Sequence, residues 1–274
     1  MSLLQAILLG IVQAATEFLP ISSSAHLVLV PFLLGWQLPT DQAFVFDVLV
    51  QLGTLLAVIV YFWRDLWAIV RGWGLALLHR KPFETQAARL GWYLILATIP
   101  AGVLGLLFKD VVERAFASPL AAGGFLLLTA ALLWAAERWS QPTQSLETLD
   151  WKMALWMGAG QALAILPGVS RSGATISAGM ARGLRRADAA RFSFLMSLPV
   201  MLAAGLLGVL DLRHVQGLMS FLPVLLVGFA VAALVGYLVI RWLLGYLSQR
   251  SMRPFAFYCV ALAVLVGVVW AVRG

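Results

Sequence analysis

Long apolar runs separated by short charged segments dominate the sequence. Six of the runs are long enough to cross the hydrocarbon layer of a membrane, which takes about 17 to 25 helical residues. They cover residues 44–63, 90–108, 119–138, 192–210, 221–243 and 255–272. Runs of this length do not fit the roughly 10-residue alternating strands of a membrane barrel. The pattern therefore predicts an all-α, polytopic membrane protein with six transmembrane helices.

Two further apolar segments, residues 3–34 and 151–182, are interrupted near the middle by proline and clustered serine. Each also carries charge at a depth where a full crossing would place it in hydrocarbon. Two half-length helices joined by a polar turn, entering and leaving on the same side, resolve such a break. We therefore expect two re-entrant helical hairpins besides the six spans.

These two broken segments are alike at a fixed offset of 148 residues, without a gap. The offset matches Gly10 with Gly158, Gln13 with Gln161, Ala14 with Ala162, Ser22 with Ser170, Ser24 with Ser172, Phe44 with Phe192 and Phe46 with Phe194. We infer an internal duplication within a single membrane domain, with one repeat at about residues 1–140 and the other at about 150–274. Because each repeat holds a hairpin and three spans, an odd number, the second copy is inverted relative to the first.

Lys and Arg are distributed unevenly over the loops of this topology, which include the segment 64–89. Of the 19, fourteen fall in one group of loops and four in the other, with Arg171 set aside in a hairpin. The group of four consists of Lys109, Arg114, Arg213 and Arg273. Cytoplasmic loops carry the excess of positive charge, so the group of fourteen is cytoplasmic. The two hairpins then enter from opposite sides, and Glu17 and Arg171 become neighbours near the midplane, where inverted repeats place their sites.

Composition agrees with a membrane protein. Hydrophobic residues make up 62% of the 274 residues, charged residues 11%, and the mean hydropathy is +0.94. These values lie far outside the range of soluble domains. The net charge of +7 comes from residues dispersed over loops, so topology accounts for it and we expect no nucleic-acid partner. The single cysteine, Cys259, excludes an intrachain disulfide and is expected to pack as a small apolar side chain.

The first hairpin carries an acid at its break. Gln13 and Glu17 are four residues apart and share a helix face, which Pro20 terminates just beyond the carboxylate. A glutamate in an apolar helix needs a cation, a polar partner or an aqueous cleft. We expect metal ligation or phosphate chemistry at Glu17. Hydrogen bonding that merely pins the hairpin is the alternative.

Three serines and a histidine follow the same break. Ser22, Ser23 and Ser24 are placed to cap the next half-helix, whose N-terminus attracts anions, and capping is at least as strong an explanation as chemistry for each serine alone. His26 lies in the first turn of that half-helix, and beside an acid and hydroxyls we expect it to be catalytic. A packed or solvated histidine is the alternative.

The second break runs from Pro167 to Thr175 and is suited to an anion. Gly168 and Gly173 allow a ligand close to the backbone, and Arg171 offers a bidentate fork that matches phosphate oxygens. Hydroxyl donors come from Ser170, Ser172 and Thr175. The alternative is a structural arginine paired with a carboxylate such as Glu17.

Gln51 is a weaker candidate. It lies in the first span, one turn from Asp47, and could line the same cleft. Packing between helices explains this glutamine equally well.

Four segments carry a family resemblance: residues 17–26 (EFLPISSSAH), 50–53 (VQLG), 166–175 (LPGVSRSGAT) and 192–195 (FSFL). In this order and spacing, over nearly the whole chain, the sequence resembles the bacterial undecaprenyl-diphosphate phosphatase family of the bacitracin-resistance type. The resemblance implies an inner-membrane enzyme that removes the terminal phosphate of undecaprenyl diphosphate and regenerates the monophosphate carrier for cell-wall synthesis. It also implies dependence on a divalent cation, Mg²⁺ or Ca²⁺, and a site that opens to the periplasm.

The same resemblance assigns roles to individual residues. It maps a (Glu/Gln)-x-x-x-Glu motif onto Gln13 and Glu17, serine and histidine positions onto Ser23 and His26, and a phosphate-binding arginine motif onto residues 170–175. Many members carry a carboxylate where this chain has Gln13. A single carboxylate is therefore left on this helix face, and we expect Glu17, helped by Gln13, to hold the metal.

We expect Glu17, Ser23, His26 and Arg171 to be catalytic. Ser23 is the nucleophile with His26 as its base, or His26 activates water directly; the sequence leaves both open. The expected partners are the bilayer, a polyprenyl diphosphate and, as an open alternative to a monomer, a second copy in a homodimer. A polyprenyl-phosphate flippase or anion transporter could use the same residues without hydrolysis, because transporters are also built from inverted repeats with broken helices.

Overall fold

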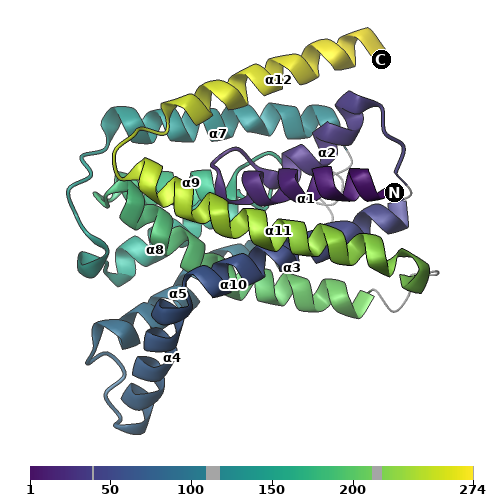
Figure 1. The fold of residues 1–274 in the computed structure, drawn as a ribbon. Coiled ribbons are helices and arrows are strands. Elements are labelled where there is room, and N and C mark those ends of the chain that lie inside the picture. Colours follow the sequence, from purple (N-terminus) through teal and green to yellow (C-terminus); the bar gives the residue numbers. More distant parts are fainter. Residues whose placement is uncertain (39, 109–117, 212–217, 274) are drawn as a thin grey trace.

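Helices make up nearly all of the computed structural model, which describes residues 1–38, 40–108, 118–211 and 218–273 (Figure 1). In chain order the elements are α1 (Leu3–Phe18), α2 (Ser23–Leu34), α3 (Thr40–Tyr61), α4 (Trp63–Leu78), α5 (Gln86–Leu107), α7 (Pro119–Trp139), the 3-10 turn η1 (Leu146–Thr148), α8 (Trp151–Leu163), α9 (Arg171–Ala181), α10 (Arg186–Asp211), α11 (Leu218–Leu247) and α12 (Arg253–Arg273). Within the described ranges the one β-type pairing is an isolated bridge between Gln144 and Leu184. The all-α class is confirmed.

Six helices in the described part of the chain are long and apolar enough to cross a membrane. They are Ala43–Tyr61, Gln86–Leu107, Pro119–Trp139, Arg186–Leu210, Phe221–Leu247 and Arg253–Arg273. Each matches one predicted span. The largest difference is at α10, which begins six residues before the predicted boundary of 192 because its first turn is polar: Arg185 pairs with Asp188 at 2.7 Å, and Arg186 pairs with Glu137.

The two broken segments each form a pair of short helices joined by a turn. With 16 residues in α1, 12 in α2, 13 in α8 and 11 in α9, none of these helices spans a hydrocarbon core of about 30 Å at a rise of about 1.5 Å per residue. The α1–α2 pair opens toward the end of the molecule that holds the N-terminus, and the α8–α9 pair opens toward the opposite end (Figure 1). This is the arrangement expected for two hairpins of opposite orientation. Their re-entrant insertion into the membrane stays a prediction.

Each hairpin packs against a long helix from the other half of the chain. A Cβ atom on Gly10 would lie 3.0 Å from the carbonyl oxygen of Gly228 on α11, and one on Gly158 would lie 2.6 Å from the carbonyl oxygen of Ala97 on α5. The 148-residue offset matches these two glycines, so equivalent positions serve equivalent contacts. The contacts support the duplication, while the repeat boundaries stay a prediction.

The helix α4 is not predicted from the sequence, which places residues 64–89 in a loop. It projects from the body of the molecule (Figure 1) and packs on α5, where the rings of Trp73 and Trp92 lie 5.2 Å apart. Arg64 and Arg71 interrupt the apolar stripe of this helix, so the hydropathy pattern does not predict a span here. The number of spans does not change.

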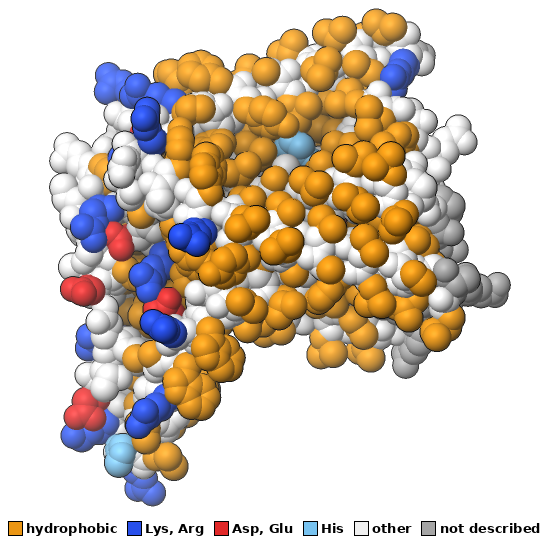
Figure 2. Space-filling view, in the orientation of Figure 1, with side chains coloured by type: hydrophobic (Ala, Val, Ile, Leu, Met, Phe, Trp, Pro, Cys, Tyr) orange, Lys and Arg blue, Asp and Glu red, His pale blue; other side chains and the backbone are white. Residues whose placement is uncertain are grey.

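Lys and Arg gather at the end of the molecule from which α4 projects (Figure 2). At this end Arg186 donates to both carboxylate oxygens of Glu137, at 2.8 and 2.6 Å, and Arg191 pairs with Asp65 at 2.5 Å. Arg273 lies at the opposite end, where it donates to the carbonyl of Phe32 at 2.6 Å. The remaining members of the smaller charge group, Lys109, Arg114 and Arg213, lie outside the described residues.

Candidate active site

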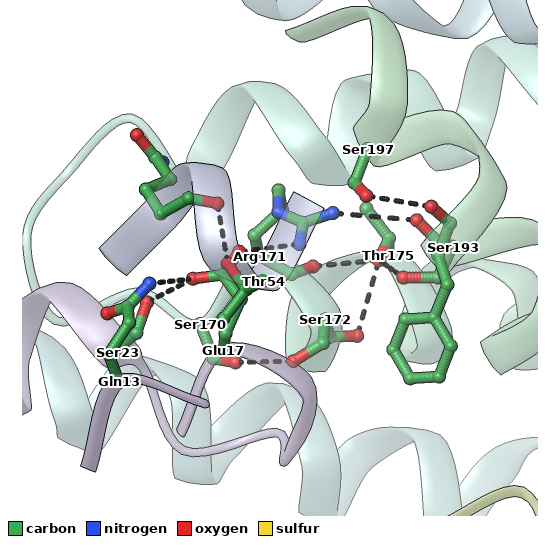
Figure 3. A network of polar contacts seen from close by, with 12 residues as sticks. Gln13, Glu17, Ser23, Thr54, Ser170, Arg171, Ser172, Thr175, Ser193 and Ser197 are labelled. Carbon is green, nitrogen blue, oxygen red and sulfur yellow. Dashed lines mark hydrogen bonds and ion pairs between the residues drawn. The ribbon is translucent and has the colours of Figure 1, made fainter. Parts of the chain in front are cut away.

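The two hairpins meet at a buried ion pair. Glu17, in the last turn of α1, accepts a hydrogen bond at Oε1 from Nη2 of Arg171, the first residue of α9, at 2.8 Å across 154 residues of sequence (Figure 3). Their side chains are only 6% and 15% exposed. This is the juxtaposition that the inverted topology predicts. It is also the pairing proposed as the structural alternative for Arg171. We call residues 17–27 the first tip and residues 165–175 the second tip.

The second carboxylate oxygen of Glu17 collects two further groups of the first hairpin. Oε2 accepts from the Ser23 hydroxyl at 2.6 Å and from Nε2 of Gln13 at 3.1 Å. An O–H···O⁻ bond this short is charge-assisted, and such bonds are roughly twice as strong as neutral ones. The arrangement places a carboxylate where it can take the proton of the Ser23 hydroxyl.

The three consecutive serines of the first tip have three different partners. Ser22 is the N-cap of α2, with its Oγ accepting from the Ala25 amide at 3.4 Å. Ser24 lies 3.1 Å from the Ser22 Oγ and accepts from the Gly168 amide of the second tip at 3.4 Å. Of the three, Ser23 is the one that contacts Glu17. Capping, the alternative given for these serines, is therefore observed at Ser22, while a catalytic role of Ser23 stays a prediction.

Ser22 adopts an unusual backbone conformation, with φ 70° and ψ 102°. Positive φ in a residue other than glycine costs about 1 to 3 kcal/mol and persists only where surrounding contacts hold it. The strained residue directly precedes Ser23, so it sets the direction from which Ser23 faces Glu17.

His26 is held at both ring nitrogens. Nδ1 lies 2.7 Å from the Ser22 carbonyl oxygen, and Nε2 lies 2.8 Å from the hydroxyl oxygen of Tyr258 on α12. A carbonyl only accepts, so Nδ1 carries the proton in this contact and Nε2 of the neutral ring accepts from Tyr258. The structure thus pairs Ser23 with Glu17, and a role of His26 as the base of Ser23 stays a prediction. A catalytic role of His26 stays a prediction.

The hydroxyls predicted to bind phosphate on the second tip are buried and have protein partners. Ser170 is the N-cap of α9, accepts from the Gly173 amide at 3.1 Å, and lies 3.1 Å from the Ser172 hydroxyl. Ser172 donates to the Leu19 carbonyl of the first tip at 3.1 Å. Thr175 donates to the Arg171 carbonyl at 2.7 Å. These bonds fix the position of Arg171, and direct contact of the three hydroxyls with substrate stays a prediction.

Packing explains both glycines of the second tip. Gly168 has φ +103°, and a Cβ atom there would lie 2.3 Å from the carbonyl oxygen of Ala122 on α7. Its own carbonyl accepts from Thr129 of α7 at 2.9 Å. A Cβ on Gly173 would lie 3.1 Å from that of Ser170. Close approach of a ligand, the predicted role, is not needed to account for either residue.

Several residues of the site were not singled out from the sequence. Ser193 on α10 lies 2.6 Å from the Thr175 hydroxyl, and its carbonyl accepts from Nη1 of Arg171 at 3.5 Å. Ser193 lies within residues 192–195, one of the four segments of the resemblance, so a signal for it existed. Tyr258 lies in an apolar run without any polar pattern, and nothing in the sequence connects it with His26. The predicted residue Gln51 accepts at its backbone carbonyl from the Thr54 hydroxyl at 2.8 Å within α3, and contact of its side chain with substrate stays a prediction.

The oxygens next to the ion pair suit a hard cation. Oε1 of Gln13 is buried without a hydrogen-bond partner, beside the carboxylate of Glu17. Carboxylate and amide oxygens are the ligands that Mg²⁺ and Ca²⁺ take. No cluster of three or more His, Cys, Asp and Glu exists among the described residues. The protein would therefore supply two oxygen ligands and leave the others to substrate phosphate and water, as Mg²⁺ sites commonly do.

Comparison with known proteins gives consistent matches over nearly the full length. A family model described as bacitracin resistance protein BacA matches residues 6–265. An undecaprenyl-diphosphatase of Alcanivorax borkumensis is 46% identical over 260 residues, which cover 95% of this chain and 96% of the relative. An undecaprenyl-diphosphatase of Moorella thermoacetica is 44% identical over 273 residues and 100% of both chains, and one of Methanosphaera stadtmanae is 39% identical over 274 residues and 97% of both.

Proposed function

The chain belongs to the bacitracin resistance protein BacA family, and on this premise we infer that it is an undecaprenyl-diphosphatase. It is a multi-pass membrane hydrolase that cleaves the phosphoric anhydride bond of a polyprenyl diphosphate. The products are inorganic phosphate and the monophosphate lipid that carries precursors in cell-wall synthesis. The main structural support for this function is the buried contact of Glu17 with both Ser23 and Arg171.

We propose that Arg171 and the N-termini of α2 and α9 bind the terminal phosphate. One guanidinium nitrogen of Arg171 bonds Glu17, and the fork has further N–H groups for phosphate oxygens. Helix N-termini attract anions through their free amides and their dipole. Phosphoryl transfer depends mainly on positioning and charge neutralisation, which these groups provide.

Ser23 is the proposed nucleophile and Glu17 its base. The Ser23 oxygen attacks the terminal phosphorus while its proton passes to Glu17 across the 2.6 Å contact. The bond from phosphorus to the bridging oxygen breaks, and the lipid monophosphate leaves with that oxygen. Water then attacks the phosphorus of the phosphoserine, and the bond from phosphorus to the Ser23 oxygen breaks. Glu17 returns its proton to that oxygen, and inorganic phosphate leaves with the oxygen and protons of the water. Direct attack by water, activated by Glu17 or His26, is the alternative.

A divalent cation, Mg²⁺ or Ca²⁺, would be held by Glu17 and Oε1 of Gln13 together with substrate oxygens, and would neutralise charge on the diphosphate. Two oxygen ligands from the protein are fewer than a dedicated cation site offers. Removal of the metal should therefore leave the fold intact while abolishing turnover.

We propose that the protein lies in the bacterial inner membrane with its site open to the periplasm. The basic end faces the cytoplasm under the positive-inside tendency (Figure 2). The α1–α2 hairpin, which carries Glu17 and Ser23, then enters from the periplasmic side. A homodimer also stays a proposal, which native mass spectrometry of the detergent-solubilised protein tests.

The decisive assay measures free phosphate from undecaprenyl diphosphate with the purified, detergent-solubilised protein. We expect release with Mg²⁺ or Ca²⁺ and none with excess chelator. Arg171→Ala should lose about 10³-fold in turnover because a positioned charge at the transferring phosphate is removed. Arg182→Ala, at the other end of α9, is the matched control and should stay near wild type. No release with any cation would favour the flippase or anion transporter instead.

A further inference from the structure

A chain of hydrogen bonds connects the last helix of the protein with the proposed nucleophile. The Tyr258 hydroxyl on α12 donates to Nε2 of His26, and Nδ1 of His26 donates to the Ser22 carbonyl. Ser22 precedes Ser23 and holds φ 70°. Ser23 in turn donates to Oε2 of Glu17. We propose that Tyr258 is a positioning residue that acts through His26 on the backbone of Ser22 and so orients Ser23. The inference rests on the proposed phosphatase function.

The geometry of the Tyr258–His26 contact favours one protonation state of the imidazole. The two rings are nearly parallel, at 8°, with centroids 5.6 Å apart, and the tyrosine oxygen lies 2.8 Å from Nε2 of His26. The bond to the carbonyl requires a proton on Nδ1. The lone pair of Nε2 then accepts a hydrogen bond from the tyrosine hydroxyl. Loss of the Tyr258 hydroxyl would free Nε2 and leave the imidazole held at one nitrogen only.

The strained conformation of Ser22 explains why a second support is needed. At the equivalent position of the second tip, Ser170 caps α9 with φ −68°, an ordinary value. Ser22 caps α2 with positive φ, which other residues than glycine rarely adopt. The Ser22 carbonyl receives both the His26 amide, at 3.3 Å, and the His26 ring, at 2.7 Å. Position 174, which matches His26 by the 148-residue offset, is alanine and offers no such bond.

Tyr258 is placed at the boundary between the site and the surroundings of the protein. His26 is buried, whereas Tyr258 is 44% exposed. The following residue, Cys259, is buried, with its Sγ 4.0 Å from the Pro20 carbonyl in the turn of the first tip. Two consecutive residues of α12 therefore contact the turn that carries Ser23. Tyr258 thus contacts the first tip from an element at the far end of the sequence.

The test compares two tyrosine-to-phenylalanine variants. Tyr258→Phe keeps the ring and removes the donor to His26. Tyr246→Phe is the matched control: it removes a hydroxyl that donates to the Ser251 carbonyl at 3.2 Å, at the basic end of α11. We expect Tyr258→Phe to lower kcat about tenfold with KM within about twofold, because misplacement of a reacting group slows the chemical step. Tyr246→Phe should keep kcat within about twofold of wild type.

A double-variant cycle with His26→Asn tests the route of the effect. The asparagine amide can still donate to the Ser22 carbonyl but has no atom in the place of Nε2. We expect His26→Asn to retain measurable turnover and Tyr258→Phe to change its kcat by less than about twofold in that background. Equal losses in both backgrounds would mean that Tyr258 acts on the substrate directly and would overturn the proposal. Complete inactivity of His26→Asn would overturn it too, because the imidazole would then do more than hold Ser22.

Failure of the positioning role and failure of the phosphatase function give different results. Wild-type turnover together with an unimpaired Tyr258→Phe variant contradicts only the role of Tyr258. Absence of phosphate release from the wild type contradicts the proposed function. In that case ¹⁵N chemical shifts of the His26 ring still report the tautomer: we expect protonated Nδ1 in the wild type, with a changed Nε2 signal in Tyr258→Phe. An Nε2-protonated ring in the wild type would overturn the inferred contact.

Discussion

The first tip and the second tip share a set of hydrogen bonds but differ in the side chain at the first helical position. Ser22 and Ser170 both cap the returning helix, and each lies 3.1 Å from the serine two residues later. Those second serines, Ser24 and Ser172, each reach into the opposite turn, where one accepts from Gly168 and the other donates to Leu19. The bonds that join the tips are therefore nearly symmetric.

The chemistry is not symmetric. At the first helical position the first tip has Ser23 and the second has Arg171, and the position of Glu17 is occupied by Ile165 in the second copy. Duplication thus accounts for a hydrogen-bonded frame, and divergence at a few positions within it accounts for the proposed nucleophile on one side and the proposed phosphate-binding arginine on the other.

The largest effect is expected at the acid, which has no counterpart. Glu17→Gln removes the proton acceptor of Ser23 and the charge partner of Arg171, so turnover should fall about 10³-fold. Ile165→Val, at the equivalent position of the second tip, should stay near wild type because it changes one methylene of a partly buried side chain. Phosphate-release assays on both variants check this. Similar losses in the two would remove the functional asymmetry of the tips.

Variants of two neighbouring serines of the first tip should affect different properties, one turnover and the other stability. Ser23→Ala is expected to lose about 10²-fold or more in kcat, because it deletes the proposed nucleophile beside Glu17. Ser24→Ala removes a bond between the tips and should lower the free energy of unfolding by about 1 kcal/mol, with a loss of only a few-fold in turnover. Single-turnover kinetics and thermal unfolding in detergent measure the two effects. Near-normal turnover of Ser23→Ala would favour direct attack by water.

The sequence predicts the frame of the molecule better than the contacts within the site. The six spans follow from hydropathy, and the contact between Glu17 and Arg171 follows from the duplication and the charge distribution. Residue type also identifies Ser170, Ser172 and Thr175 as hydroxyl donors. It does not identify their partners, because a serine near a helix start caps the helix or binds an anion with the same atoms.

Tyr258 and α4 show two other reasons why the sequence does not predict a feature of the structure. The bond between Tyr258 and His26 joins residues 232 positions apart, in helices that no local pattern relates. The helix α4 is amphipathic and carries arginines within a short apolar stripe, so a search for long apolar runs passes over it. Positive φ at Ser22 is likewise a result of tertiary contacts and has no signature in the serine itself.

The glycines of the second tip should differ in how much stability they contribute. Gly168→Ala places a Cβ atom 2.3 Å from a backbone oxygen of α7 at positive φ, and should lower the free energy of unfolding by about 2 kcal/mol or more. Gly173→Ala meets side chains and no backbone atom, Ser170 at 3.1 Å and Thr129 at 3.4 Å, and should cost about 1 kcal/mol or less. Thermal unfolding compares them. A reversed order would contradict the packing of the second tip on α7.

The smallest effect concerns the two caps. Ser22→Gly relieves positive φ while losing a cap, so its free energy of unfolding should change by less than about 0.5 kcal/mol or rise. Ser170→Gly relieves no strain and loses a buried cap, and should be destabilised by about 1 kcal/mol. Melting temperatures of the two variants, each against wild type, test the difference. Equal shifts of the same sign would show that Ser22 is not strained.

A double-variant cycle on phosphate release tests whether one site is assembled from both tips. Glu17→Gln, Arg171→Ala and the combined variant are compared with wild type. Residues that act as a unit are strongly non-additive, so we expect the combined variant to be no slower than Arg171→Ala. For two single losses of about 10³-fold each, this corresponds to a coupling of about 10³-fold, roughly 4 kcal/mol. Losses that multiply would mean that Glu17 and Arg171 act independently, and would contradict a site shared by the two tips.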